Sequence, residues 1–331
     1  MKTFILRLCI FTSFQICLFS LALLFYSTTD SNNFLAETSV KHERLRQADR
    51  GKIVLVGGSS AAFGFSSERV VDAFSRPVVN MGLAAGLGME FMLSEVRRKL
   101  YPGDILVLSF EYEHFSRGFR GGSGVGFDPN LLEQVIVFRP AGFLDLSRVH
   151  FRRIVLDRGH RILGAIARRA LANLFKRNRN HPLAERNPSM RRGFNEWGDF
   201  VAHRTLEAEG RRIPVHPGHI VASAINYPHP SLCAFLSREV DDLTARGIIV
   251  MWSFPPRPEE AINNEPEIAL LLDKRLREIP HLVVLDSPLD HVYPTNRFFD
   301  TDHHLDSLGA NLRTDRLIEV LRLSPAFDVS Q

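Results

Sequence analysis

The 331-residue chain contains only three cysteines, and their positions limit how it can be cross-linked. Cys9 and Cys17 lie in an apolar N-terminal run, so Cys233 is the single cysteine of the remaining chain and cannot form an internal disulfide there. Internal repeats and low-complexity tracts are also absent, and 24% of the residues are charged, which argues against disorder. With 45% apolar residues, the chain can bury a sizeable core without cross-links.

One long N-terminal stretch lacks charge altogether. Residues 8–26 contain no Asp, Glu, Lys or Arg, and this length approaches the ~20 residues that a helix needs to cross a bilayer. Lys2 and Arg7 precede the stretch and favour a cytoplasmic N-terminus. We therefore expect residues 1–28 to form a signal anchor, a single transmembrane helix with the later domain on the far side. A cleavable signal peptide is the alternative.

Positive charge is unevenly distributed along the chain. The segment Arg148–Arg192 holds thirteen Arg or Lys residues but only Asp157 and Glu185 as acids. Three interpretations are open: a solvated helix face, contact with anionic membrane lipids, or binding of an acidic glycan or carrier lipid. Nucleic acid is not an expected partner, because the bulk of the chain should lie outside the cytoplasm.

The remaining chain alternates between short apolar runs and helical patterns. Such alternation is typical of α/β domains with a parallel sheet, whose strands are buried on both faces. We expect a polar stalk over residues 29–50, then a domain over 51–325 that is interrupted by a basic helical insertion at about 128–217. Strands are expected at 53–56, 77–80, 105–110, 248–252 and 282–285, and helices at 67–74, 89–100, 230–246, 265–279 and 306–323.

A Gly-Gly-Ser turn follows the first expected strand, in the segment Val54-Leu-Val-Gly-Gly-Ser-Ser-Ala-Ala-Phe-Gly64. Ser59 would stand at the carboxyl edge of the sheet, with its own N–H near the start of a helix and able to stabilise an oxyanion. A tight connection or an anion-binding nest is the alternative for such a turn. After the second strand, small residues from Asn80 to Gly86 would let another backbone N–H approach the same crevice, unless they only form a packing turn.

A second chemically rich segment lies about 240 residues later. It places Asp300, Asp302, His303 and His304 within five positions, directly before the last expected helix, whose N-cap should be Asp306. A serine nucleophile, a histidine base and an orienting carboxylate are the parts of acyl-transfer chemistry, so hydrolysis or transfer of an ester is the leading hypothesis. Metal binding by the cluster is the alternative.

These segments together resemble the SGNH (GDSL-like) hydrolase superfamily, in particular its membrane-anchored branch associated with acylation of bacterial cell-surface polysaccharides. The resemblance covers residues 50–125 and 220–325. Its matching positions are Gly57-Gly58-Ser59 for the nucleophile block, Asn80, Gly82 and Gly86 for the second block, and His304-Leu305-Asp306 followed by Gly309-Ala310 for the last block.

The resemblance leaves the acid and part of the oxyanion hole open. The common family spacing would join Asp300 to His303, whereas a shorter spacing in relatives would join Asp302 to His304. We favour His304 as the base, with Asp300 or Asp302 behind it. The third family block normally supplies an Asn donor, but this chain has Glu111 in that region, either as a structural residue or as a contact for a sugar hydroxyl.

By resemblance, the expected fold is a three-layer α/β/α sandwich, and Ser59 with Gly82 or Gly86 would supply the oxyanion donors, with Asn80 near the substrate. The implied activity is that of a serine esterase or O-acyl(acetyl)transferase on a cell-envelope or exported polysaccharide, without cofactor or metal. The implied setting is the bacterial inner membrane, with a periplasmic domain and a membrane acyl-donor or export partner. The alternative is a decayed scaffold that binds glycan or docks an export complex.

Overall fold

The computed structural model describes residues 3–5, 7–8, 10–15, 33–116, 129–136, 138–139, 191–208, 210, 215 and 227–328. The chain divides into two compact units, one of residues 1–31 with 129–187 and one of residues 32–128 with 188–331. In the first unit, the description covers short N-terminal helical segments and helix α6 (Pro129–Ile136). All candidate site residues belong to the second unit.

No helix within the described ranges is long and apolar enough to cross a membrane. Of the expected span over residues 8–26, only residue 8 and residues 10–15 are described, so the anchor stays a prediction. The basic segment also lies outside the described residues, except for Arg191 and Arg192.

A five-stranded parallel sheet forms the centre of the second unit. Its strand order is β2 (Val78–Asn80), β1 (Ile53–Gly57), β3 (Ile105–Ser109), β4 (Ile249–Trp252) and β6 (Val283–Val284). In register, Ile53 of β1 pairs with Val78 and Ile105 on either side. The expected α/β class with a parallel sheet is confirmed. A second, two-stranded sheet pairs β5 (Arg257–Pro258) with β7 (Val292–Tyr293).

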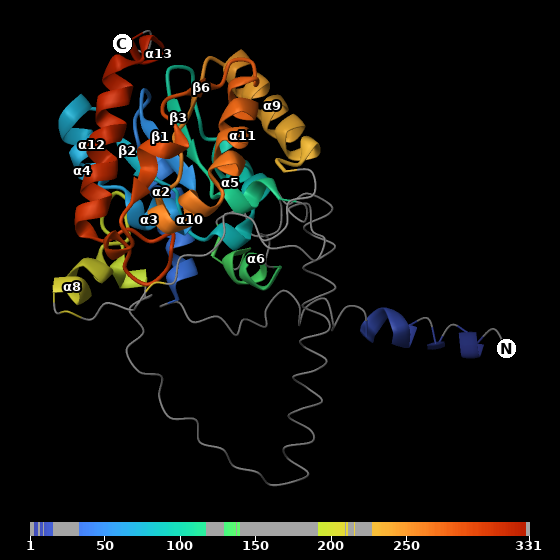
Figure 1. The fold of residues 1–331 in the computed structure, drawn as a ribbon. Helices are drawn as coiled ribbons and strands as arrows, with labels where there is room; N and C mark the ends of the chain where they lie inside the picture. Colours follow the sequence, from blue (N-terminus) through green and yellow to red (C-terminus); the bar gives the residue numbers. More distant parts are fainter. Residues whose placement is uncertain are drawn as a thin grey trace. The chain divides into compact units, whose positions relative to one another are not determined.

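Helices lie on both faces of this sheet (Figure 1). One side carries α4 (Ser67–Phe74) and α12 (Ser307–Leu323), and the other carries α5 (Met89–Arg97), α9 (Pro230–Ala245) and α11 (Pro266–Arg277). The strands form because both of their faces bury apolar side chains; every residue of β1 and β3 is buried. On the side of α12, Leu317 and Leu321 pack in one core cluster with Leu55 and Val107.

The second unit contains further helical segments, most of them short. They are η1 (Phe34–Ala36), α2 (Glu37–Gln47), α3 (Ser59–Gly64), η2 (Ala85–Leu87), η3 (Tyr112–Phe115), η4 (Arg191–Gly193), α8 (Ala202–Ala208), α10 (Glu259–Asn264), η5 (Pro288–His291), η6 (Thr295–Arg297) and α13 (Pro325–Asp328).

The strand order places a topological switch point between β1 and β3. The chain leaves β1 for β2 on one side, then crosses back over β1 to reach β3 on the other. Because these two connections run on opposite faces of the sheet, they diverge at the carboxyl ends of β1 and β3. In open α/β sheets, ligands bind in the crevice at such a point. Ser59 follows β1 there, and Glu111 follows β3.

The segment expected to be a polar stalk differs from that expectation. From Asn33 onward it forms η1 and α2, and α2 packs beside β2. Leu35 and Leu45 are buried, but so are Lys41 and His42. The sequence gives no helical apolar stripe here because part of the buried face of α2 is polar and is satisfied by hydrogen bonds.

The starts of two long helices follow from local chemistry. Asp306 is the N-cap of α12, and its side chain accepts a hydrogen bond from the Gly309 N–H at 2.6 Å, which confirms the expected cap. Pro230 opens α9 at a position where a proline loses no helical hydrogen bond.

Candidate active site

A histidine and a carboxylate form a close pair at the loop before α12. The Nδ1 of His304 lies 2.6 Å from Oδ1 of Asp300, and both side chains are partly exposed. The loop that carries them is closed by an antiparallel bridge between Phe298 and Leu305. Because the carboxylate accepts the Nδ1 proton, Nε2 of His304 is the nitrogen that can take up and return a proton.

The neighbouring acid and histidine belong to a different cluster. Asp302 lies 3.0 Å from the guanidinium of Arg257, and His303 accepts a hydrogen bond from Arg257 at 3.0 Å. Glu113 also lies near Arg257, at 3.5 Å. The sequence left open whether Asp300 or Asp302 pairs with the histidine base. In the structure Asp300 pairs with His304, and Asp302 pairs with Arg257. Among the described residues, no group of three or more His, Cys, Asp or Glu is arranged to hold a metal ion.

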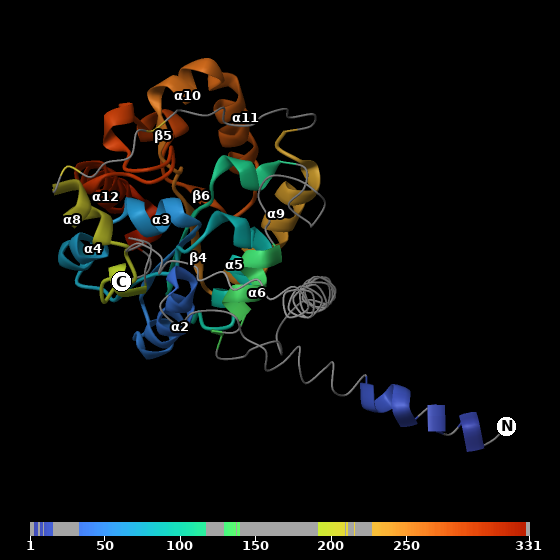
Figure 2. The ribbon, with the colours of Figure 1, turned by 90° about the horizontal axis from the view of Figure 1, so that it is seen from below.

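Ser59 is the first residue of α3 and is partly exposed. Phe63 lies four residues later, on the same face of this short helix. Its ring stacks on the His304 imidazole with centroids 3.8 Å apart and planes 7° apart. The stacking places the imidazole against the residue that lies one helical turn after Ser59. No hydrogen bond joins Ser59 to His304 in the described part of the chain, as is common in substrate-free sites. Viewed from below, α3 lies beside α12 and α8 (Figure 2).

A second histidine supports the loop of His304. His203 of α8 is fully buried, and its Nε2 donates to the carbonyl of Leu305 at 3.1 Å. Its ring packs 4.9 Å from Phe63. Burial, with help from the nearby Arg204, lowers the pKa of His203 to about 4, so the imidazole is neutral at physiological pH. Sequence reasoning missed His203, because a single histidine within the expected insertion carries no local signal.

Asn80 ties the end of β2 to α3, the short helix that begins with Ser59. Its buried amide donates to the Ala61 carbonyl at 2.9 Å and to Asp199 at 2.8 Å, and its Oδ1 accepts the Gly82 N–H at 2.8 Å. The side chain of Asn80 is therefore occupied by protein partners. Gly82 could act as an oxyanion donor only if it shared or exchanged this bond. Gly86 is partly exposed in η2.

Glu111 binds the main chain on both sides of Ser59. Its buried carboxylate accepts the N–H of Gly58 at 3.2 Å and of Ser60 at 3.0 Å. Burial would raise the pKa of Glu111, but His114, His303 and the Ser60 N–H favour the charged form and leave the pKa below its ordinary value. The carboxylate is thus ionised at neutral pH and lies in the region where the family resemblance implies an Asn donor.

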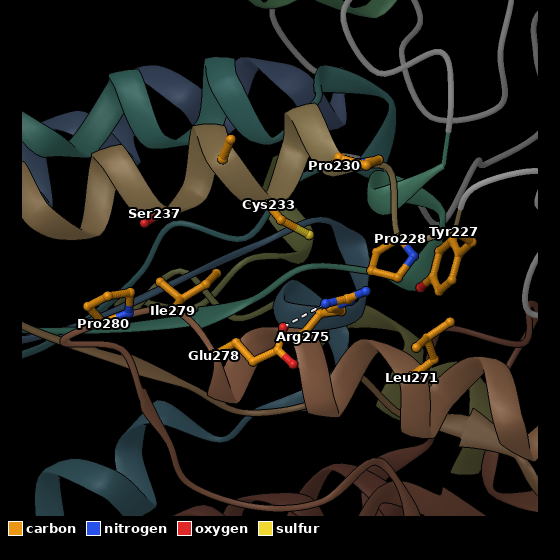
Figure 3. Close-up of a pocket in the computed structure, with 11 residues that line it drawn as sticks. Tyr227, Pro228, Pro230, Cys233, Ser237, Leu271, Arg275, Glu278, Ile279 and Pro280 are labelled. Carbon is orange, nitrogen blue, oxygen red and sulfur yellow. Dashed lines mark hydrogen bonds and ion pairs between the residues drawn. The ribbon is translucent and has the colours of Figure 1, made fainter.

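A separate hollow lies away from these residues, between α9 and α11 (Figure 3). Its volume is about 500 Å³, and an ion pair of 2.8 Å joins Arg275 to Glu278 at its wall. Burial raises the pKa of the Cys233 thiol that lines it, so this cysteine is not an activated nucleophile.

Comparison with known proteins identifies no relative: no protein-family model, curated protein or solved structure matches the chain. The chemistry must therefore be inferred from the residues themselves.

Proposed function

We propose that the protein is a serine ester hydrolase or acyltransferase in which Ser59 is the nucleophile, His304 the base and Asp300 the orienting acid. One observation carries the proposal: His304, which is paired with Asp300, stacks on Phe63, and Phe63 lies one helical turn after Ser59 in α3. The location of Ser59 at the switch point of the parallel sheet adds support, because ligands of open α/β sheets bind there.

In the proposed reaction, the Ser59 oxygen attacks an acyl carbonyl while its proton passes to Nε2 of His304. The tetrahedral oxyanion collapses, the bond to the leaving alcohol breaks, and the alcohol oxygen takes the proton from His304. Water or a second hydroxyl then attacks the acyl-enzyme, again giving its proton to His304. Asp300 holds the imidazole tautomer and stabilises the imidazolium. The Ser59 N–H, which has no hydrogen-bond acceptor in the described part of the chain, would face the oxyanion together with Gly86 or Gly82.

The resemblance to SGNH hydrolases extends the proposal to substrate and setting. The three-layer sandwich, the single-pass inner-membrane anchor and the periplasmic domain belong to this extension. An O-acyl, in particular O-acetyl, ester on an envelope or exported polysaccharide would be the substrate. A transferase on that side of the membrane would need a partner that passes it an acyl donor.

A non-enzymatic scaffold is the second candidate, and two contacts favour it. The ionised Glu111 adds negative charge beside the Ser59 turn, which opposes an oxyanion there, and the Gly82 N–H is already bonded to Asn80. Such a scaffold would bind glycan or dock an export complex. The paired Asp300 and His304 favour the enzyme.

The test is the intact mass of the full-length protein after reaction with a fluorophosphonate. We expect a single adduct on the wild type that is lost in Ser59→Ala and His304→Ala. The neighbouring Ser60 is buried, so Ser60→Ala is the matched control and should keep the adduct. No adduct on a folded wild type would favour the scaffold, and an adduct retained in Ser59→Ala would refute the assignment of the nucleophile.

A further inference from the structure

The turn that carries Ser59 is pressed against the end of β3. A Cβ atom on Gly57 would lie 2.2 Å from the Ser109 carbonyl oxygen, and one on Gly58 would lie 2.4 Å from Oε1 of Glu111. Both positions therefore need glycine because of close approach, and the turn conformation is set by its neighbours in space.

Glu111, which follows β3, caps α3 from a distant part of the sequence. The N-terminal N–H groups of a helix lack intrahelical partners, and α3 has no capping side chain from its own N-cap residue, Gly58. The Glu111 carboxylate accepts two N–H groups of this turn, those of Gly58 and Ser60. Because these residues flank Ser59, the carboxylate fixes the main chain on both sides of the nucleophile.

Arg313 of α12 holds the same turn from the other direction. Its Nη1 donates to the Ser60 carbonyl at 2.8 Å, and its Nη2 donates to the Ser109 hydroxyl at 2.6 Å. The guanidinium is fully buried and lies over the Phe65 ring, 4.0 Å from its centroid. Burial lowers the pKa of Arg313 to about 10, so it stays charged at neutral pH. Ser60 is thus bound by an anion at its N–H and by a cation at its carbonyl.

This arrangement links the nucleophile turn to the base. Arg313 lies on α12, whose N-cap Asp306 follows His304 by two residues. The buried contact of Arg313 with Ser60 is therefore one of the contacts that set the distance between the two proposed catalytic groups, together with the stacking of Phe63 on His304.

We propose that Glu111 and Arg313 are positioning residues that hold the main chain around Ser59 in register with His304, a role that rests on the proposed function. The competing explanation is that both are buried charges that only stabilise the fold. A buried carboxylate that only stabilises the fold is available as a control at the amino ends of β1 and β3, where Asp104 precedes β3. The buried carboxylate of Asp104 accepts the N–H groups of Gly51 and Tyr101, each at 2.8 Å, and pairs with Lys52 at 2.6 Å.

The experiment compares full-length wild type with Glu111→Gln, Arg313→Lys and the control Asp104→Asn. Fluorophosphonate labelling at several probe concentrations separates apparent probe affinity from the maximal labelling rate. We expect Glu111→Gln and Arg313→Lys to lower the maximal rate about 10- to 100-fold with unchanged affinity, because small misplacements of reacting groups have effects of this size. Asp104→Asn should lose stability but keep its maximal rate. Equal rate losses in Glu111→Gln and Asp104→Asn, or a wild-type rate in Glu111→Gln, would refute the positioning role.

Amide hydrogen exchange gives a readout that does not depend on activity. In Glu111→Gln, exchange over residues 57–62 should rise about tenfold or more while exchange in α12 stays unchanged, because one of the two acceptor oxygens of the turn is replaced by an amide NH₂ and the other becomes a weaker, neutral acceptor. If the wild type is not labelled at all, the proposed function fails. Unchanged exchange over residues 57–62 in Glu111→Gln would separately refute the role of Glu111 in holding the turn.

A further variant is available if Glu111→Gln or Arg313→Lys does not fold. Ser109→Ala removes one hydrogen bond of Arg313 and should slow labelling by a few-fold. Labelling at the wild-type rate would count against the role of Arg313.

Discussion

A buried lysine makes the stability of the second unit depend on pH. Lys41 of α2 is 1% exposed, and its ammonium donates to the carbonyls of Asn80 at 2.8 Å and Gly198 at 2.5 Å. Burial lowers its pKa from 10.5 to about 7; Arg44 acts in the same direction, and Glu37 and Asp199 partly offset them. The same lysine binds the main chain of Asn80, whose side chain in turn binds the Ala61 carbonyl of α3.

The sign of the effect follows from proton uptake. Between pH 7 and 10.5, the unfolded chain binds a proton at Lys41 that the folded chain has largely released. The free energy of unfolding therefore rises with pH through this window and is reduced below pH 7. At 1.36 kcal/mol per pKa unit, the full shift corresponds to about 5 kcal/mol, of which about 2 kcal/mol falls between pH 7 and 9.

The assay is urea unfolding of the full-length protein, followed by tryptophan fluorescence at pH 7, 8 and 9. Trp197 and Trp252 are the only tryptophans of the chain, and both lie in the second unit. The variant Lys41→Met leaves two carbonyls without this donor, at a cost of about 1–3 kcal/mol each that does not depend on pH. The wild type should therefore gain about 2 kcal/mol more than Lys41→Met from pH 7 to 9. Parallel pH curves would refute the reasoning.

Two further substitutions follow from the geometry. Asp300→Asn should slow fluorophosphonate labelling by up to about 10⁴-fold, because the carboxylate that fixes the imidazole tautomer of His304 is lost. Asp302→Asn removes a partner of Arg257 and should slow labelling by less than about tenfold. Equal losses of rate in the two variants would contradict the choice of Asp300 as the acid. Gly58→Ala should lower the free energy of unfolding by about 1–3 kcal/mol, because its Cβ would lie 2.4 Å from Glu111 and 2.7 Å from the Ala85 Cα. A urea midpoint equal to that of the wild type would show that the turn can give way.

Much of the fold could be predicted because each element carries its own local signal. The range expected for α4 is the observed one, Ser67–Phe74, and the expected N-cap of α12 is Asp306. The strands were recognisable because both faces of a parallel sheet are buried, which makes each strand a continuous apolar run. The packed helix α2 was missed because its buried residues include Lys41 and His42, whose polar groups are satisfied only by distant partners such as Asn80 and Glu95.

The sequence by itself determined the two chemical segments, Gly57–Ser59 and Asp300–His304, because their residue types and the strand and helix around them are local properties. Only the tertiary structure decided that Asp300 is the acid beside His304, since Asp302 forms an ion pair with Arg257. It also decided that Glu111 binds the turn of Ser59. Both choices depend on which charged group from another strand or loop lies within hydrogen-bond distance, and spacing along the chain does not encode that distance.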